Sequence, residues 1–324
     1  MPPAVSRPPA GISRALLTFV SSGCLTAYYE EPGARSKEPG AKNWELGTGN
    51  KEQVGLSCFG LFTFVQMRIN VALLPGKITG PSHSVCVVVD VLRASSSIVT
   101  LLEGGSSRVI ATAGIEEARA LHGRLPDHLL CGERAGLPPP GFDYGNSPAE
   151  FSRLDLHGKG TILATSNGTR LLAELRDAPA VLVGCLLNRT ATAQAAVQIA
   201  GERALGVTVV CSAAYGGSTF VLEDALGAGA IIDAALSADR SLEATDAARF
   251  TRDAFLTARG DLPGTIASCY HAGELTAVGL GDDVTYCAQL DVSQIVPILE
   301  RGENGALALL PYAHDARNPS GDRG

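Results

Sequence analysis

The sequence is poor in aromatic residues, in charge of either sign and in long apolar runs. Aromatic residues make up 5% of the 324 residues and charged residues 18%. No block of lysine and arginine offsets the formal net charge of −7, so we expect no nucleic-acid partner. The first apolar patch, residues 15–20, is too short to span a membrane, and we expect no membrane partner. With 45% hydrophobic residues, the chain has the composition of an ordinary globular protein with a large core.

Paired cysteine motifs are also absent. None of the eight cysteines belongs to a Cys-x-x-Cys pair, so zinc-ligand and redox spacings are missing. Four of them lie in or beside apolar runs: Cys86, Cys131, Cys185 and Cys211. We therefore expect buried free thiols and a cytoplasmic protein.

Residues 1–66 differ in composition from the rest of the chain. The stretch 30–53 is rich in proline, glycine and charge, which is typical of a disordered segment. The patch 15–20, with Arg14 before it, also resembles a signal peptide with a short apolar core. We expect residues 1–66 to be an N-terminal extension, disordered or translated from an upstream start codon. The catalytic domain then covers residues 67–312, and the polar tail 313–324 is expected to fray.

Beyond the extension, apolar runs alternate with amphipathic stretches. Strands are predicted at Ile69–Leu73, Val85–Val91, Arg108–Ala111, His128–Cys131, Gly160–Thr165, Ala180–Gly184, Val207–Cys211 and Ala306–Leu310. Helices are predicted at Ser95–Glu103, Ile115–Leu121, Thr169–Arg176, Arg189–Arg203, Leu222–Leu236 and Ala244–Ala258. This alternation indicates an α/β fold with a mainly parallel or mixed sheet and helices on both faces, a three-layer α/β/α arrangement.

Polar residues directly follow five of the predicted strands, in segments 90–97, 131–148, 165–170, 184–190 and 211–225. In a parallel sheet, the carboxyl ends of the strands share one edge, where helix N-termini offer free N–H groups to ligands. We therefore expect the five segments to converge on one crevice.

The first of these segments is the most informative. Val85–Val89 is an unbroken apolar run, typical of a strand buried on both faces, and Asp90, Arg93 and three serines follow it. A carboxylate at such a place can hold a metal, and an arginine can bind an anion. The pattern therefore indicates phosphate chemistry. Arg93 and Arg134 are both predicted to bind anions in preference to forming structural salt bridges.

Other polar residues have a structural alternative. Ser147 fits a helix N-cap that forms a capping box with Glu150. Asn167-Gly168-Thr169 fits either a plain turn or an oxyanion site. Glu223-Asp224 fits either a first-turn pair that offsets the helix dipole or part of a magnesium shell. His271 is expected at the surface, with proton transfer as the lesser alternative.

Familiar phosphatase motifs are missing. Asp90 does not begin an Asp-x-Asp motif, no cysteine has an arginine at Cys-x5-Arg spacing, and Arg-His-Gly does not occur. The glycine loops match neither of the common nucleotide-binding patterns. No single short motif therefore identifies the reaction.

Seven segments, taken together in order and spacing, resemble the 2-phosphosulfolactate phosphatase family. They are VVVDVLRASSSIV, CGERAG, GFDYGNSPAEF, ATSNGTRLL, VGCLLNRTA, LEDALGAGAI and DDVTYCAQLDVSQIVPIL. The resemblance runs from about Met67 to Leu299. It implies a magnesium-dependent phosphatase of coenzyme M biosynthesis, which hydrolyses (2R)-2-phospho-3-sulfolactate to 3-sulfolactate and phosphate. One segment departs from the family: 271–275 lacks the arginine of the His-Gly-Arg-x-x-Leu-like stretch that many members carry, which affects substrate identity if that arginine contacts the sulfonate.

This chemistry leads to a predicted site. Catalytic roles are expected for Asp90, Arg93, Glu133 and Arg134. The polar lining for the substrate is expected to comprise Asn146, Ser147, Asn167, Gly168, Thr169 and Asn188. Mg2+ is expected on Asp90 and on Glu223 or Asp224, with Glu133 as a further candidate ligand.

Two other functions stay open. One is a phosphatase of another 2-hydroxy acid phosphate, such as phospholactate or phosphoglycolate. The other is a non-catalytic anion-binding protein. The expected partner is a small anionic phosphate ester, and the subunit number, including a homo-oligomer, is open.

Overall fold

The computed structural model describes residues 66–302 and 306–313. They belong to one compact unit, Phe62–Gly324. The predicted N-terminal extension lies outside the described residues except for Gln66, and so does the predicted tail except for its first residue.

Within the described residues, ten strands form a single mixed sheet in the order β4-β5-β3-β10-β9-β6-β2-β7-β1-β8. They are β1 (Arg68–Ala72), β2 (Ser84–Val89), β3 (Arg108–Thr112), β4 (Leu129–Gly132), β5 (Gly160–Ala164), β6 (Ala180–Gly184), β7 (Gly206–Cys211), β8 (Glu243–Ala244), β9 (Pro297–Arg301) and β10 (Leu307–Pro311). All eight predicted strands are present. The pattern does not predict β8, which has two residues, or β9, which begins with proline and ends in charged residues.

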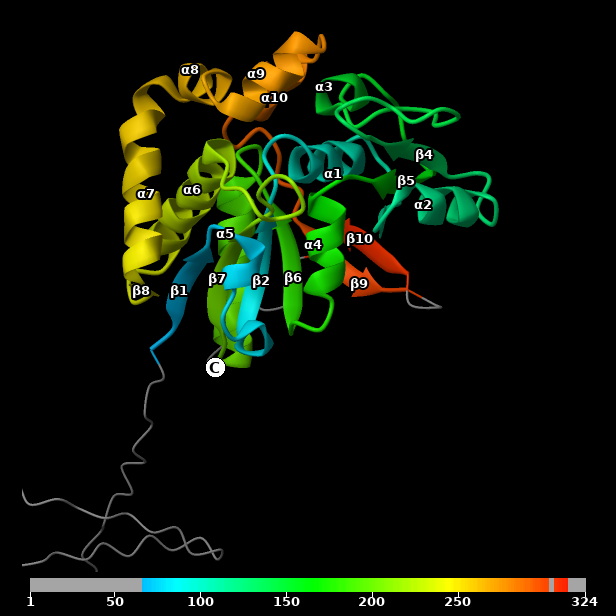
Figure 1. Cartoon of the computed structure of the whole chain (residues 1–324). Coiled ribbons are helices and arrows are strands. Elements are labelled where there is room, and N and C mark those ends of the chain that lie inside the picture. The colour runs from blue at the N-terminus through cyan, green and yellow to red at the C-terminus, as the bar shows by residue number, and fades with distance from the viewer. Residues whose placement is uncertain (1–65, 303–305, 314–324) are drawn as a thin grey trace, which may run out of the picture. The chain divides into compact units, whose positions relative to one another are not determined.

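The sheet contains two sets of parallel strands. One set is β6, β2, β7, β1 and β8, and the other is β3, β5 and β4. The hairpin β9–β10 lies between them and pairs antiparallel with β6 on one side and β3 on the other (Figure 1). The pairs β6–β9, β9–β10 and β10–β3 are all antiparallel. The strands of the second set therefore run in the opposite direction to those of the first. The expectation that all five strand ends share one parallel edge is therefore wrong.

Sheet twist nevertheless brings ends from both sets together. Neighbouring strands rotate by roughly 20–25°, so the five steps from β5 to β2 accumulate a rotation on the order of 100°. A Cβ on Gly168, just after β5, would lie 2.8 Å from Asp90 Oδ2, just after β2, so these two strand ends lie close together.

Ten α-helices cover the described sheet. They are α1 (Ala94–Glu103), α2 (Ile115–His122), α3 (Pro148–Phe151), α4 (Gly168–Glu174), α5 (Arg189–Arg203), α6 (Leu222–Ala238), α7 (Asp246–Ala258), α8 (Leu262–Ala267), α9 (Tyr270–Ala277) and α10 (Gly281–Cys287). Short 3-10 turns occupy Pro75–Lys77, Pro81–His83 and Arg259–Asp261. The six predicted helices are present, whereas α3, α8, α9 and α10 have at most eight residues and give little periodic signal.

Strand β2 shows how the three layers form. Val85, Val87 and Val89 belong to the core that includes the apolar residues of α5, α6 and α7. Cys86 and Val88 alternate with them and belong to a second core with α1 and α4. Because every residue of β2 is buried, the strand has helices on both faces, and the predicted three-layer arrangement is confirmed.

Two further features complete the described structure. Helices α8–α10 run across the top of the molecule in Figure 1. No helix in the described ranges combines the length and the apolar character needed to cross a membrane. All six cysteines within these ranges are free and buried, as predicted, and burial raises the pKa of Cys86 to about 12.

Candidate active site

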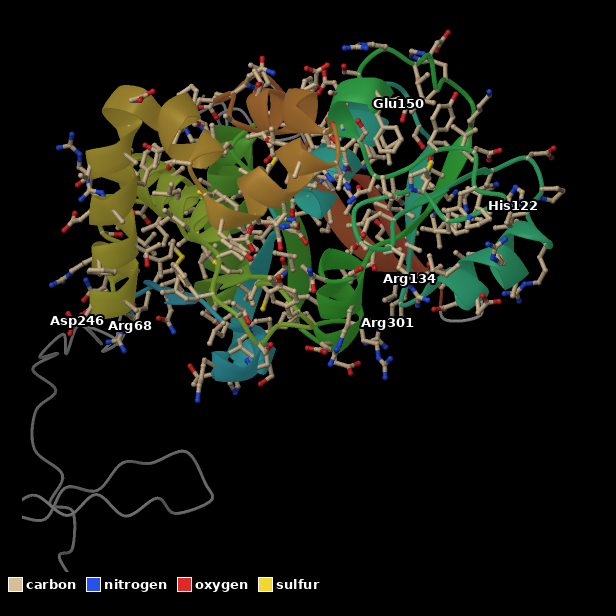
Figure 2. The ribbon with its side chains drawn as sticks, turned by 45° about the horizontal axis from the view of Figure 1, so that its top comes forward. Arg68, His122, Arg134, Glu150, Asp246 and Arg301 are labelled. Carbon is tan, nitrogen blue, oxygen red and sulfur yellow. The ribbon has the colours of Figure 1, made fainter. Side chains whose placement is uncertain are left out.

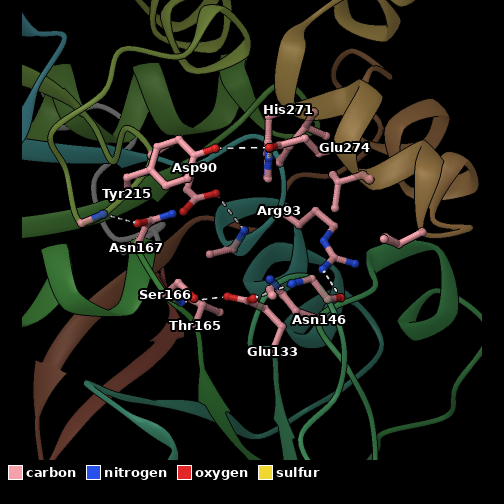
Figure 3. A pocket seen from close by; sticks show the side chains of 18 residues that line it. Asp90, Arg93, Glu133, Asn146, Thr165, Ser166, Asn167, Tyr215, His271 and Glu274 are labelled. Atoms are coloured by element: carbon pink, nitrogen blue, oxygen red, sulfur yellow. Dashed lines mark hydrogen bonds and ion pairs between the residues drawn. The ribbon is translucent and has the colours of Figure 1, made fainter.

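A cavity of about 380 Å3 lies where the chain leaves β2, β4, β5 and β7, and α9 provides another of its walls (Figure 3). Its polar lining comprises Asp90, Arg93, Glu133, Asn146, Thr165, Ser166, Asn167, Tyr215, His271 and Glu274. Four of the five predicted segments contribute to this lining. The fourth segment, 184–190, does not, and α9 contributes although no strand end precedes it.

Asp90 is held in place by the start of α1. Its Oδ1 accepts a hydrogen bond from the Ala94 N–H at 3.1 Å, and its own N–H donates to Ser95 Oγ at 2.9 Å. A Cβ on Gly168 would lie 2.8 Å from Asp90 Oδ2, so glycine permits the close approach of α4. Burial raises the pKa of Asp90, while hydrogen bonds from Ser212 and Ala94 act in the opposite direction. The cavity therefore holds a positioned carboxylate whose charge is costly without a nearby cation.

Glu133 joins two loops at the cavity wall. Its Oε1 accepts from the Ser166 N–H at 2.8 Å, and its Oε2 accepts from the Gly136 N–H at 3.0 Å. Its negative charge contributes to the raised pKa of Asp90. Two carboxylates from different strand sets thus face one cavity, as the sequence predicts.

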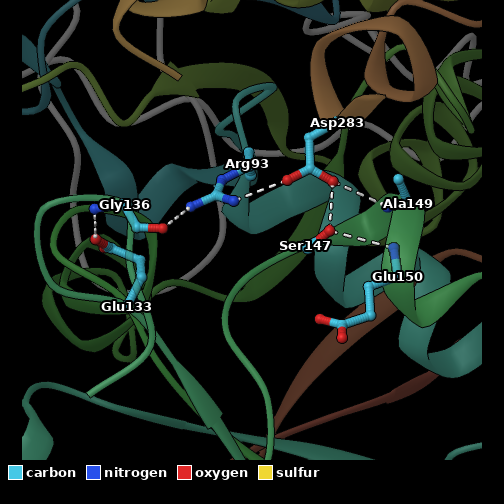
Figure 4. Close-up of polar contacts among 7 residues, drawn as sticks. All are labelled: Arg93, Glu133, Gly136, Ser147, Ala149, Glu150 and Asp283. Atoms are coloured by element: carbon cyan, nitrogen blue, oxygen red, sulfur yellow. Dashed lines mark hydrogen bonds and ion pairs between the residues drawn. The ribbon is translucent and has the colours of Figure 1, made fainter. Parts of the chain in front are cut away.

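Arg93 forms a buried ion pair (Figure 4). Its Nη1 lies 2.8 Å from Asp283 Oδ2, and its Nη2 donates to the Gly136 carbonyl at 2.9 Å. Asp283 Oδ1 also accepts from the Ser147 hydroxyl at 2.6 Å and from the Ala149 N–H at 3.1 Å. The structural salt bridge, which the prediction disfavoured, is therefore the interaction that the structure contains. Arg93 still lines the cavity, and its anion contact stays a prediction.

Arg134 does not reach the cavity lining. Its backbone pairs with Leu137, and its side chain is exposed at the surface, where Figure 2 labels it. A position just after a strand decides which edge a residue occupies, but not which way its side chain points. The predicted convergence of Arg134 with Asp90 is absent from this structure.

Three predicted polar residues have structural partners instead of facing the cavity. Ser147 caps α3 by accepting from the Glu150 N–H at 3.2 Å, which confirms the capping alternative. Asn188 is fully buried, where it accepts from the Cys185 N–H at 2.9 Å and donates to the Ile295 carbonyl at 2.8 Å. Thr169 bonds back to the Thr165 carbonyl at 3.0 Å.

Asn146 and Asn167 do line the cavity. Asn146 is 3% exposed, and its Oδ1 has no hydrogen-bond partner among the described residues. Asn167 Oδ1 accepts from the Gly216 N–H at 3.1 Å, which leaves its Nδ2 available as a donor. Both amides are in place to contact a ligand.

The predicted metal carboxylates of α6 are not among the residues that line the cavity. Asp224 Oδ1 accepts from the Val91 N–H at 2.8 Å, and its Oδ2 accepts from both Ser212 Oγ and the Ala213 N–H at 3.2 Å, so Oδ2 already has two donors. Burial and the charges of Asp90 and Glu223 raise its pKa. Glu223 is 2% exposed and its Oε1 has no partner in the described part of the chain, yet it lines only a neighbouring cavity.

No cluster of three His, Cys, Asp or Glu side chains within 66–302 and 306–313 is arranged to hold a metal. The expected shell of Asp90 with Glu223 or Asp224 involves two protein carboxylates, which this criterion does not test, and it stays a prediction. Asp90 and Glu133 fit a different arrangement, since Mg2+ is commonly bound by one or two carboxylates, several waters and substrate phosphate.

Helix α9 brings residues that the strand-end argument missed. His271 lines the cavity while its side chain stays 32% exposed, and its Nδ1 lies 2.9 Å from Glu274 Oε2. The Tyr215 hydroxyl donates to Glu274 Oε1 at 3.2 Å (Figure 3). The His-x-x-Glu spacing, which puts both side chains on one helix face, is the sequence signal that could have found this pair.

The side chains that line the cavity carry no excess of positive charge. Asp90, Glu133 and Glu274 are acidic, whereas the basic members are Arg93 and His271. Arg93 is already paired with Asp283. An anionic ligand therefore needs additional positive charge.

The cavity of this α/β fold holds positioned carboxylates beside a histidine that a glutamate orients. Such groups can transfer protons at a polar substrate, as in the active site of an enzyme. Residues 73–302 match the model of the family described as 2-phosphosulpholactate phosphatase. The chain therefore belongs to that family, as the resemblance predicted. Membership makes it a phosphatase, a hydrolase of phosphoric monoesters.

Three relatives align with this chain over nearly their whole length. The "Probable 2-phosphosulfolactate phosphatase" of Deinococcus radiodurans is 38% identical over 255 residues, covering 75% of this chain and 99% of the relative. The protein of the same description from Pseudothermotoga lettingae is 37% identical over 231 residues, covering 71% and 95%. A third, from Carboxydothermus hydrogenoformans, is 35% identical over 232 residues, covering 71% and 92%.

Proposed function

We propose that the protein hydrolyses (2R)-2-phospho-3-sulfolactate to 3-sulfolactate and phosphate with Mg2+ as cofactor. The observation that carries the proposal is the cavity in which Asp90 and Glu133 face the His271–Glu274 pair, in a chain whose relatives carry this activity in their descriptions. We place the reaction in the cytoplasm and in coenzyme M biosynthesis, as the family resemblance implies.

Charge balance supports the metal requirement. The substrate carries a phosphate of about −1.5 to −2, a carboxylate and a sulfonate, which amounts to nearly −4 at neutral pH. The lining is itself acidic, with Asp90, Glu133 and Glu274 against an arginine that is already paired. Bringing these charges together without a cation would cost much in free energy.

Asp90 and Glu133 are the residues that would hold Mg2+. Bound there, the ion would offset the phosphate charge and lower the pKa of a coordinated water. The Ala94, Ser166 and Gly136 N–H groups orient the two carboxylates before any ligand arrives. Such preorganisation avoids rearrangement during the reaction.

His271 is suited to move a proton. Its Nδ1 faces Glu274, so Nε2 is the ring nitrogen left to give a proton to the departing alkoxide or take one from water. Glu274 in turn is held by the Tyr215 hydroxyl. Asn146 and the free amide donors of Asn167 can orient the ester by hydrogen bonds to its oxygens.

The test is phosphate release from 2-phospho-3-sulfolactate, 2-phospholactate and phosphoglycolate, with Mg2+ and with EDTA. We expect turnover of the first ester to be fastest and to stop with EDTA. Preference for another ester would contradict the substrate, undiminished turnover in EDTA would contradict the cofactor, and binding without release would favour an anion-binding protein.

A further inference from the structure

Arg170 lies beside the loop after β7 that lines the cavity, although it is not itself a lining residue and the sequence argument assigned it no role. It is on α4, and its guanidinium is directed at the loop after β7: a Cβ on Gly216 would lie 3.2 Å from Arg170 Nη1. Gly216 lines the cavity and has a φ of +69°, and its N–H donates to Asn167, another lining residue. A glycine at 216 thus leaves room for the guanidinium beside the cavity.

The Nη groups of the Arg170 guanidinium are available as hydrogen-bond donors. Its Nε donates to Glu174 Oε1 at 3.0 Å, one turn along α4. Within 66–302 and 306–313 the structure shows no hydrogen bond from Nη1 or Nη2. The side chain is 57% exposed, and exposed pairs at this spacing are weak, so the group can turn toward a ligand at small cost.

The cavity needs such a cation. The lining includes no lysine, Arg93 is engaged at both Nη atoms, and His271 is paired with Glu274. Mg2+ on Asp90 and Glu133 would serve the phosphate. The sulfonate, which stays ionised at all working pH values, is left without a counter-charge in the lining.

We propose that Arg170 binds the sulfonate and thereby selects 2-phospho-3-sulfolactate over esters that lack this group. The inference rests on the proposed function. Two free Nη groups of one planar guanidinium suit the oxygens of an oxyanion, whereas an ammonium would act only as a point charge.

The test compares Arg170→Met with wild type on 2-phospho-3-sulfolactate and on 2-phospholactate, which has a methyl group in place of the sulfomethyl arm. For the sulfonated ester, kcat/KM should fall about 10- to 100-fold, mainly through KM, as for loss of hydrogen bonds to a charged group. For 2-phospholactate it should change less than about threefold. Arg170→Lys should lie between Met and wild type on the sulfonated ester.

Arg176→Met is the matched control. Arg176 follows α4 closely and is 60% exposed, so its replacement removes the same charge from a similar surface position, but it lines a different cavity, beside β3 and β10. Its kinetics should equal those of wild type. An equal loss on both esters in Arg170→Met, or no loss on either, would overturn the assignment.

Calorimetry separates this inference from the proposed function. Wild-type protein that releases no phosphate from any ester would refute the function, yet 3-sulfolactate binding still tests Arg170. We expect Arg170→Met to bind 3-sulfolactate about 10-fold or more weakly than wild type does. Arg176→Met should bind it with the affinity of wild type. Equal binding by wild type and Arg170→Met, or no binding by wild type, would overturn the role of Arg170.

Discussion

His271 and Glu274 face each other across one turn of α9, with Nδ1 of the histidine 2.9 Å from Oε2 of the glutamate. This pair gives the cavity an oriented imidazole that otherwise would have to be held by substrate alone. Replacing His271 with Gln should therefore lower kcat by about 10²- to 10⁴-fold, the usual contribution of a general acid or base. Phosphate release at saturating substrate measures it, and a rate near that of wild type would remove His271 from the reaction.

The two cavity carboxylates should respond to mutation in a characteristic way. Asp90→Asn keeps the shape of the side chain but removes the charge, so Mg2+-dependent turnover should fall by about two to four orders of magnitude. Burial raises the pKa of Asp90, which means that its buried charge is unfavourable in the folded protein. Removing this charge should therefore leave the melting temperature unchanged or raise it by about a few degrees. Circular dichroism melting and phosphate release check both parts. A fall in activity with loss of the folded spectrum would assign Asp90 a structural role.

The buried pair of Arg93 and Asp283 makes a prediction about stability. Arg93→Met should lower the free energy of unfolding by about 3–5 kcal/mol, because Asp283 is then left as an unpaired buried charge. The double variant Arg93→Met/Asp283→Asn should recover part of this loss. Urea unfolding measures all three proteins. Arg134→Met is the exposed control and should shift the free energy by no more than about 0.5 kcal/mol.

His128 makes a prediction about pH. Burial and the nearby Arg108 lower its pKa from 6.5, and its Nε2 is buried without a partner in the described part. The unfolded chain therefore takes up a proton at a higher pH than the folded protein does. This stability is complete above about pH 6.5 and is lost as the pH falls from there toward the lowered folded pKa.

The variant His128→Phe removes the titrating group and leaves no polar atom unpaired. We expect the melting temperature of wild type to drop more between pH 7.5 and 5.5 than that of the variant. Melting curves of both proteins across this range provide the measurement. Parallel curves would show that the His128 proton does not contribute.

Local patterns predicted the parts of the site that local interactions build. The unbroken apolar run of β2 specifies a buried strand, and Asp90 follows it at the point where α1 supplies N–H groups within five residues. Ser147 and Glu150 form their cap within a span of four residues. In such cases the partners are close in sequence, so their spacing alone carries the geometry.

Local sequence patterns specified the α/β alternation, the family, and two of the three cavity carboxylates, Asp90 and Glu133, because strand periodicity, capping and motif spacing act over short stretches of chain. Only the tertiary structure shows that β9–β10 reverses the three strands β3, β5 and β4, that Arg93 pairs with a residue 190 positions away, and that Arg134 points outward while α9 brings in His271. These outcomes depend on pairings between distant segments and on side-chain direction, and neither leaves a periodic signal in the chain.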